Sequence, residues 1–290
     1  MGIKILLLLR KTTMKIRLFP GAIVLLNIIR CCYLSKTIEL QVDDFDGDLF
    51  MGLCLCEHMQ SQIFWYGYYN RDIVMVLRKF LKSGMVVIDV GANVGEISLI
   101  AAKLVGRSGC VYAFEPQLTV ADKLECNIRL NGFSQVTIQK IGLSDKREVR
   151  EIYCASSKFK DGSKNEGLAT LYPSEERETV VGIIELVTLD DFCQSHEISK
   201  LDLIKIDIEG SELPVLRGAM GVLRKYMPYI IIEVQQETAS KAGYNASDIL
   251  SLLHDIGYRF ELIERRGKLC NVNENSLGEF QNVLCSPRFV

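Results

Sequence analysis

The stretch Met85-Val-Val-Ile-Asp-Val-Gly-Ala-Asn-Val-Gly95, continued by Glu96-Ile-Ser-Leu-Ile-Ala-Ala-Lys-Leu-Val105, decides the fold. It opens with apolar, mostly β-branched residues up to Asp89, typical of a strand buried on both faces of a parallel sheet. Gly91 and Gly95 permit a tight turn, and the residues that follow have helical spacing. The stretch therefore predicts a strand, a glycine loop and a helix.

The same alternation continues outward along the chain. Strands are expected at 110–114, 136–141, 201–208, 229–234, 258–263 and 282–285, and helices at 71–81, 118–131, 189–196, 211–225 and 246–255. Alternation of this kind predicts an α/β fold, a doubly wound, Rossmann-like and mostly parallel sheet with right-handed crossovers. Because no helix separates the last two strands, an antiparallel strand is expected at the C-terminal edge.

The residues before this pattern predict additions to the main fold. Residues 37–69 contain two alternating segments around Asp43-Asp-Phe-Asp-Gly-Asp48, typical of a β-hairpin. We therefore expect a basic and apolar extension at 1–36, a β-hairpin extension at 37–69 and one principal domain at 70–290. A chain of 290 residues with 48% hydrophobic content can bury such a core.

Charge is distributed unevenly. Residues 1–38 contain seven Lys and Arg and no acid, so the rest, with 27 basic and 36 acidic side chains, has a formal charge of −9. This charge disfavours a nucleic-acid partner, since phosphate binding needs clustered cations. The apolar run 18–29 is interrupted and shorter than the ~18 to 20 residues that span a bilayer. Two interpretations stay open: a packed or disordered extension, and a signal-like segment or peripheral membrane contact.

The ten cysteines show no paired spacing with downstream histidine of the kind that zinc sites require. They are interpreted as reduced thiols of a cytoplasmic protein. Cys54 and Cys56 would share one face of a strand, which favours two packed side chains over a redox pair. The polar segment 155–178 is long for a loop in a compact domain, and is typical of a lid, a binding loop or disorder.

The glycine loop predicts a cofactor site, because ligands of open parallel sheets bind beyond the carboxyl ends of the strands. With Asn93 between Gly91 and Gly95, the spacing differs from the Gly-x-Gly-x-x-Gly dinucleotide motif. Asp89 would repel a pyrophosphate but suits the cationic amine of S-adenosylmethionine. Glu115 follows the next strand, where a carboxylate can bind both ribose hydroxyls.

A second group of charged residues lies in Leu203-Ile-Lys-Ile-Asp-Ile-Glu-Gly210. Lys205, Asp207 and Glu209 would share one face of a strand, and they need partners because unpaired buried charges are costly. In the usual strand order, Asp89 and Glu233 would end the neighbouring strands. The acids could act as a general base or hold a divalent metal, with Asp207, Glu209 and Glu233 as its ligands, whereas Lys205 could be a catalytic residue or form a structural ion pair.

Together these residues resemble the FkbM-type family of S-adenosylmethionine-dependent methyltransferases. The motifs are Val87-Ile-Asp-Val-Gly-Ala-Asn-Val-Gly95, Tyr112-Ala-Phe-Glu-Pro116, Gly142-Leu-Ser-Asp145, Val187-Thr-Leu-Asp-Asp191, Leu203-Ile-Lys-Ile-Asp-Ile-Glu-Gly-Ser-Glu212 and Ile231-Ile-Glu-Val234. The resemblance runs from about residue 66 to residue 285 and implies a seven-stranded sheet. It also implies O-methylation of a hydroxyl on a sugar, glycolipid or other small natural product.

The resemblance further implies individual roles. Asp89, Gly91 and Gly95 would surround the methionyl group, and Ser144-Asp145 would lie beside adenine. Asp207 and Glu209 would border the point of methyl transfer. The chain departs from the family at Gln235, where relatives often have histidine. Two alternatives remain, a non-catalytic S-adenosylmethionine-binding protein and an NAD-dependent oxidoreductase.

Overall fold

The central sheet is the framework of the molecule in a computed structural model. The structure describes residues 3–16, 22–31, 33, 36–154, 163–164, 167, 169–174, 179–272 and 280–288. Within them, eight strands form the sheet in the order β12-β11-β13-β10-β9-β3-β4-β5. Their bounds are β3 (Val86–Val90), β4 (Cys110–Phe114), β5 (Val136–Gln139), β9 (Leu203–Ile206), β10 (Tyr229–Gln235), β11 (Tyr258–Glu264), β12 (Lys268–Asn271) and β13 (Phe280–Pro287).

Strand directions confirm the mostly parallel sheet. The five strands from β5 to β10 are paired in parallel, and β13 pairs antiparallel with both β10 and β11. Two details differ from the expectation. The strand β13 lies inside the sheet rather than at its edge, and the edge is β12, an eighth strand that turns back antiparallel on β11.

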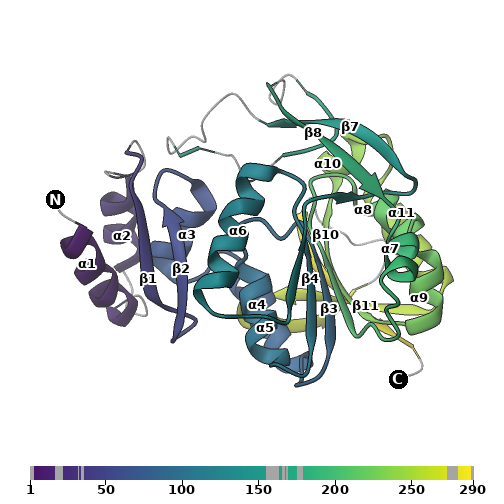
Figure 1. The fold of residues 1–290 in the computed structure, drawn as a ribbon, viewed down its shortest axis with the longest axis horizontal. Helices are drawn as coiled ribbons and strands as arrows, with labels where there is room; N and C mark the ends of the chain where they lie inside the picture. The colour runs from purple at the N-terminus through teal and green to yellow at the C-terminus, as the bar shows by residue number, and fades with distance from the viewer. Residues whose placement is uncertain are drawn as a thin grey trace.

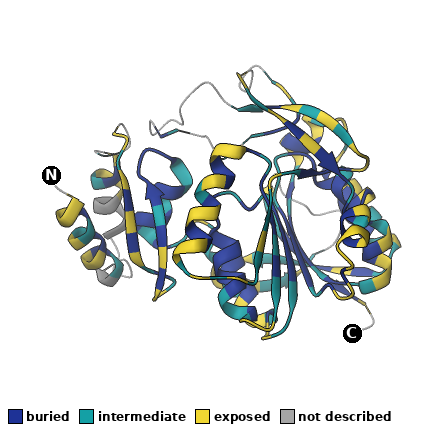
Figure 2. Ribbon diagram, in the orientation of Figure 1, coloured by how far each residue is buried: buried dark blue, intermediate teal, exposed yellow. Residues whose placement is uncertain are grey.

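Helices cover both faces of this sheet (Figure 1). One face carries α4 (Arg71–Phe80), α5 (Glu96–Val105) and α6 (Leu118–Leu130). The other carries α7 (Leu189–Ser195), α8 (Glu212–Arg217), α9 (Met220–Tyr226) and α11 (Ala246–Asp255). A short helix, α10 (Gln236–Lys241), follows β10. Burial follows this layering, because strands and inner helix faces are buried while outer faces are exposed (Figure 2).

The single helix expected at 211–225 is two helices, α8 and α9. A side chain at Gly218, between them, would place its Cβ 2.0 Å from the carbonyl oxygen of Ser144. The Gly218 carbonyl also accepts a hydrogen bond from the backbone N–H of Asp190. Contacts from two other segments therefore shape the break, and helical periodicity alone does not report them.

The N-terminal part contains the expected hairpin, β1 (Glu39–Phe45) and β2 (Leu49–Cys54). Three helices accompany it: α1 (Ile3–Ile16), α2 (Ala22–Cys31) and α3 (His58–Tyr66). The sequence did not predict α3. Cys54 and Cys56 are buried free thiols with their Sγ atoms 3.2 Å apart, although Cys56 lies in the turn after β2.

A second, smaller sheet lies above the carboxyl ends of the central strands (Figure 1). It has the order β6-β8-β7, from β6 (Gly142–Leu143), β7 (Glu148–Cys154) and β8 (Thr179–Val187). The sequence indicated only a polar stretch here. Most of the segment 155–178 lies outside the described residues, so its predicted role as a lid or binding loop stays a prediction. Among the helices that the structure describes, none is long and apolar enough to cross a membrane.

Candidate active site

A cavity of about 500 Å³ lies at the carboxyl ends of β3, β4, β9 and β10. It falls within the size range of small-molecule sites. Of the predicted site residues, seven line it: Gly91, Asn93, Glu115, Lys205, Asp207, Glu209 and Glu233. Asp89, Gly95, Ser144 and Asp145 do not appear in its wall.

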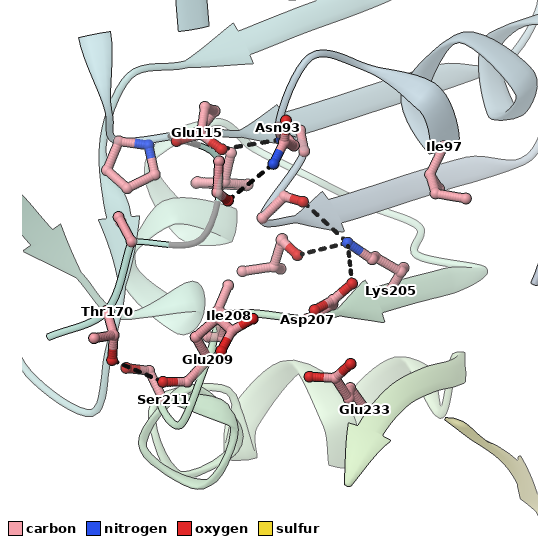
Figure 3. Close-up of a pocket in the computed structure, with 18 of the residues that line it drawn as sticks. Asn93, Ile97, Glu115, Thr170, Lys205, Asp207, Ile208, Glu209, Ser211 and Glu233 are labelled. Carbon is pink, nitrogen blue, oxygen red and sulfur yellow. Dashed lines mark hydrogen bonds and ion pairs between the residues drawn. The ribbon is translucent and has the colours of Figure 1, made fainter. Parts of the chain in front are cut away.

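Lys205 lies at the centre of the charged group, almost completely buried (Figure 3). Its Nζ is 3.6 Å from Asp89 Oδ1 and 3.4 Å from Asp207 Oδ2. The same ammonium donates a hydrogen bond to the carbonyl oxygen of Gly91, at 3.0 Å. Although burial lowers its pKa, the Asp207 and Asp89 carboxylates raise it above the ordinary lysine value. The charged Lys205 side chain therefore connects β3, the end of β9 and the glycine loop through two ion pairs and a hydrogen bond.

Asp89 lies below the cavity. Its carboxylate is fully buried, and Oδ2 accepts a hydrogen bond from the Ser98 hydroxyl at 2.5 Å. Oδ1 has no hydrogen-bond partner and faces Lys205 at ion-pair distance. The predicted contact of Asp89 with the methionyl amine stays a prediction, and the geometry favours an indirect role through Lys205.

The two loop glycines make room for protein atoms. A Cβ on Gly91 would lie 2.1 Å from the Asp207 carbonyl oxygen, and one on Gly95 would lie 2.7 Å from Leu124 Cδ1. Both glycines also have left-handed backbone, with φ of +76° and +100°. Besides the tight turn that the sequence indicated, the missing Cβ atoms therefore allow the loop to pack against the end of β9 and against α6.

Glu115 fixes the loop from the end of β4. Its Oε2 accepts the backbone N–H of Asn93 at 2.9 Å, and its Oε1 accepts that of Gln117 at 3.0 Å. Burial raises the pKa of Glu115 to about 7, with those backbone hydrogen bonds acting in the opposite direction. Its carboxylate lines the cavity and retains lone pairs that could accept ribose hydroxyls.

The Ser144-Asp145 turn lies just beyond the cavity. Ser144 is buried and donates its backbone N–H to Val187. The preceding residues, Gly142 and Leu143, are the ones that line the cavity. The motif therefore borders the cavity through its first two residues, and the position of Ser144-Asp145 beside adenine stays a prediction.

Three acids gather at the opposite side, as Figure 3 shows for Asp207, Glu209 and Glu233. Burial and the nearby Asp207 and Glu209 carboxylates raise the pKa of Glu233 well above its usual range. Glu209 has φ of +56°, and its carbonyl oxygen accepts the Thr170 hydroxyl at 2.8 Å. No group of three or more His, Cys, Asp or Glu that could hold a metal ion occurs in the described part of the chain. The structure thus gives the metal hypothesis no support.

One part of the cavity wall, formed by the first residues of α4 and α5, was not predicted from the sequence. The carboxylate of Glu96 accepts the backbone N–H groups of Tyr69 and Asn70, which joins the two helix starts. These three residues, with Arg71, line the cavity. The only sequence signal was a polar turn before an amphipathic helix, which does not reveal what it faces.

Segment 163–174 also contributes, in the residues that are described. The Gly167 carbonyl accepts a hydrogen bond from Asn93 Nδ2 at 2.9 Å, and Lys164 exchanges backbone hydrogen bonds with Cys56 and His58. Together with the hydrogen bond from Thr170 to Glu209, these contacts link the N-terminal part, the glycine loop and the loop after β9.

The fold and site define a doubly wound α/β protein with a ligand site at the carboxyl ends of its parallel strands. A family model described as the methyltransferase FkbM domain matches residues 89–260, more than half of the chain. The chain belongs to the FkbM-type family of S-adenosylmethionine-dependent methyltransferases, as its motifs indicated. The predicted NAD-dependent alternative has no support from this match.

Individual relatives are distant. The chain is 27% identical over 253 residues to the AMB antimetabolite synthetase AmbE of Pseudomonas aeruginosa, covering 77% of this chain and 12% of that protein. It is 25% identical over 190 residues to the hexuronic acid methyltransferase AglP of Haloferax volcanii, covering 64% of this chain and 68% of that protein. A crystal structure of an FkbM methyltransferase from Methylobacillus flagellatus aligns with 16% identity and a TM-score of 0.44, over 92% of this chain and 60% of that one. The chain therefore spans about one eighth of the synthetase.

Proposed function

We propose that this protein transfers the methyl group of S-adenosylmethionine to a hydroxyl of a sugar, a glycolipid or another small natural product. One observation carries the proposal. A single cavity is lined on one side by the glycine loop and Glu115, and on the other by Asp207, Glu209 and Glu233. A cofactor pocket and a group of candidate bases thus share one space, as methyl transfer to a hydroxyl requires.

The residues fit this cofactor. Carboxylates outnumber cations in the cavity wall, and Lys205 is already paired with Asp89 and Asp207. Such a wall favours a ligand with positive charges, and S-adenosylmethionine has an ammonium and a sulfonium group. Glu115 would hold the ribose hydroxyls, and Gly142 and Leu143 would border the adenine. The cofactor supplies an electrophilic methyl group when bound.

The acids support general-base catalysis. Glu233, with its raised pKa, would keep its proton near neutral pH and donate a hydrogen bond to the acceptor. Asp207 is partly exposed and forms an ion pair with Lys205, and its carboxylate would accept the proton of the attacking hydroxyl. Lys205 would hold the Asp207 carboxylate in place.

The acceptor class has support from one relative. AglP is named a hexuronic acid methyltransferase, which favours a sugar hydroxyl as the acceptor of this chain too. The three-part organisation at 1–36, 37–69 and 70–290 stays a proposal, as does a cytoplasmic location with peripheral membrane contact. The exposed Ile3, Ile5 and Leu8 of α1 support such contact.

The proposal is tested with methyl-labelled S-adenosylmethionine and a panel of glycans, glycolipids, metabolites, proteins and RNA, analysed by mass spectrometry. Wild-type protein should label a hydroxyl of a glycan or small molecule. Asp207→Asn should lower kcat by roughly 100-fold or more, and the exposed Glu39→Gln should not change it. Label found only in protein or RNA would overturn the acceptor class, and binding of the cofactor with no labelled product would favour a non-catalytic protein.

A further inference from the structure

Arg71, the first residue of α4, lines the cavity without a partner for its charge. In the described residues its guanidinium makes no ion pair and no side-chain hydrogen bond, and its Nε is shielded from solvent without an acceptor. By contrast, Arg10 forms an ion pair with Asp44, and Arg78 forms one with Asp46. A shielded donor without an acceptor costs about 1–3 kcal/mol, so Arg71 favours a ligand that supplies an anion.

Among the described residues, the rest of the cavity wall leaves Arg71 as its one unpaired cation. The other cation in the wall, Lys205, is already neutralised by Asp89 and Asp207. The wall also contains six acids: Asp72, Glu96, Glu115, Asp207, Glu209 and Glu233. Asp72, next to Arg71 in the sequence, already has a hydrogen-bond partner, because its Oδ1 accepts a hydrogen bond from the backbone N–H of Arg266 at 2.6 Å. A carboxylate that enters this cavity would therefore bind most favourably at the Arg71 guanidinium.

We propose that Arg71 is the carboxylate-binding residue of the cavity. The inference rests on the proposed function and adds the chemistry that this wall recognises. A guanidinium can bind a carboxylate through two parallel N–H···O hydrogen bonds. The carboxylate belongs either to the methionyl group of the cofactor or to an acidic acceptor.

The cavity wall near Arg71 borders both the expected cofactor side and the expected acceptor side, so either carboxylate could bind there. Tyr69 and Asn70, just before Arg71, are fixed to Glu96 at the start of α5, which follows the glycine loop. This contact joins the start of α4, where Arg71 lies, to the start of α5 beside the glycine loop. Phe280 and Asn282 also line the cavity, and Asn282 is paired with Glu233 across β13 and β10, on the acceptor side.

The first arm of the test measures binding by calorimetry with two probes, S-adenosylhomocysteine and its decarboxylated analogue. If the methionyl carboxylate is the ligand, Arg71→Gln should weaken the first probe by about tenfold or more and leave the second unchanged. Arg71→Lys should restore part of the loss. Arg107→Gln is the matched control, because it removes an exposed arginine beyond the other end of α5.

The second arm uses glucuronate and glucose, which differ in a carboxylate, as probes in saturation-transfer NMR with S-adenosylhomocysteine present. If an acceptor carboxylate is the ligand, wild type should prefer glucuronate, and Arg71→Gln should abolish the preference while S-adenosylhomocysteine still binds.

The two arms separate this inference from the proposed function. If Arg71→Gln and Arg71→Lys change neither preference for a carboxylate, the Arg71 site is overturned, even when wild type binds S-adenosylhomocysteine. If wild type does not bind S-adenosylhomocysteine at all, the cofactor assignment fails first, and a glucuronate preference that depends on Arg71 would still support the carboxylate site.

Discussion

Lys205 connects three structural units through one ammonium group. It holds Asp89 at the end of β3, Asp207 after β9 and the carbonyl of Gly91 in the loop. Each of these groups would be costly to bury alone, and together they neutralise one another. The same contacts fix the loop and orient a candidate base, so structure and chemistry share these residues.

Gly91 is predicted to be the most sensitive glycine of the loop. Gly91→Ala places a Cβ 2.1 Å from a backbone oxygen, whereas the matched Gly132→Ala, also at positive φ, meets nothing within 4 Å. Gly132→Ala should cost about 1–2 kcal/mol of unfolding free energy from backbone strain alone. Gly91→Ala should cost about 1–3 kcal/mol more. Urea unfolding checks both values, and equal losses would show that the loop can move away from Asp207.

Glu96 predicts a pH dependence of stability. Burial raises its pKa to about 7, against the hydrogen bonds from Tyr69 and Asn70, while its ordinary value is 4.5. The folded state therefore keeps a proton that the unfolded state releases, and stability falls as the pH rises from about 4.5 to about 7. The free energy of unfolding of Glu96→Gln should depend less on pH in this range, with a slope smaller by at most about 1.4 kcal/mol per pH unit. Urea unfolding at several pH values measures this slope.

The control for Glu96 is the exposed Glu39→Gln, which should leave the slope unchanged. A Glu96→Gln protein with the wild-type slope would show that Glu96 is ionised throughout this pH range.

At the residue scale, the sequence predicted which charged residues lie close together, but not the contacts that they make. Lys205, Asp207 and Glu233 could be placed together because strand ends share one edge of a parallel sheet. The position of Asp89 below the cavity, and the contact of Gly91 with Asp207, depend on packing between strands far apart in the chain. Arg71 carried no motif, so only the fold reveals that it faces the cavity.

At the element scale, α6 joins the N-terminal hairpin to the glycine loop. The buried Asn127 accepts the backbone N–H of Gly52 in β2 at 2.7 Å and donates to the Val94 carbonyl at 2.8 Å. Asn131, one turn later, forms a similar pair of hydrogen bonds with Phe50, near solvent. Two asparagine side chains thus take the place of a neighbouring strand along the edge of β2.

Asn127→Ala is expected to destabilise the protein by about 2–3 kcal/mol, because it leaves buried backbone groups without partners. Asn131→Ala should cost less than about 1 kcal/mol, since water can replace its hydrogen bonds. Equilibrium unfolding in urea measures both. Similar losses for the two variants would contradict the buried bridge between β2 and the loop.

The elements themselves were predictable where periodicity was local and strong, as in β3, β4, α5 and α11. They were not predictable where contacts from elsewhere decide them. The break at Gly218 depends on Ser144 and Asp190, and β7 pairs with β8 across a long segment. Helix α3 was missed because the apolar alternation around Cys54 and Cys56 favoured a strand.

At the scale of the whole molecule, the hydrophobic core is continuous from the N-terminal part into the main domain. One cluster contains Leu6 of α1, Phe45 of β1 and Trp65 of α3 together with Val87 and Leu99. Arg10 adds polar contacts, since its Nη1 donates to the carbonyl of Ile63 at 2.9 Å. The additions at 1–36 and 37–69 therefore share their core with the sheet.

A shared core predicts cooperative unfolding. Trp65, the single tryptophan of the chain, is completely buried in this cluster and reports on the N-terminal part. Its fluorescence and the far-ultraviolet circular dichroism of the whole chain should change with the same urea midpoint. A fluorescence transition at lower urea would show instead that the N-terminal part unfolds independently.

Calorimetric titration of the purified chain with S-adenosylmethionine tests the central claim most directly. The account predicts saturable binding of one molecule per chain, lost in Asp89→Ala because Lys205 and the glycine loop would lose their buried partner. Wild-type protein that is folded and yet binds no S-adenosylmethionine would contradict it.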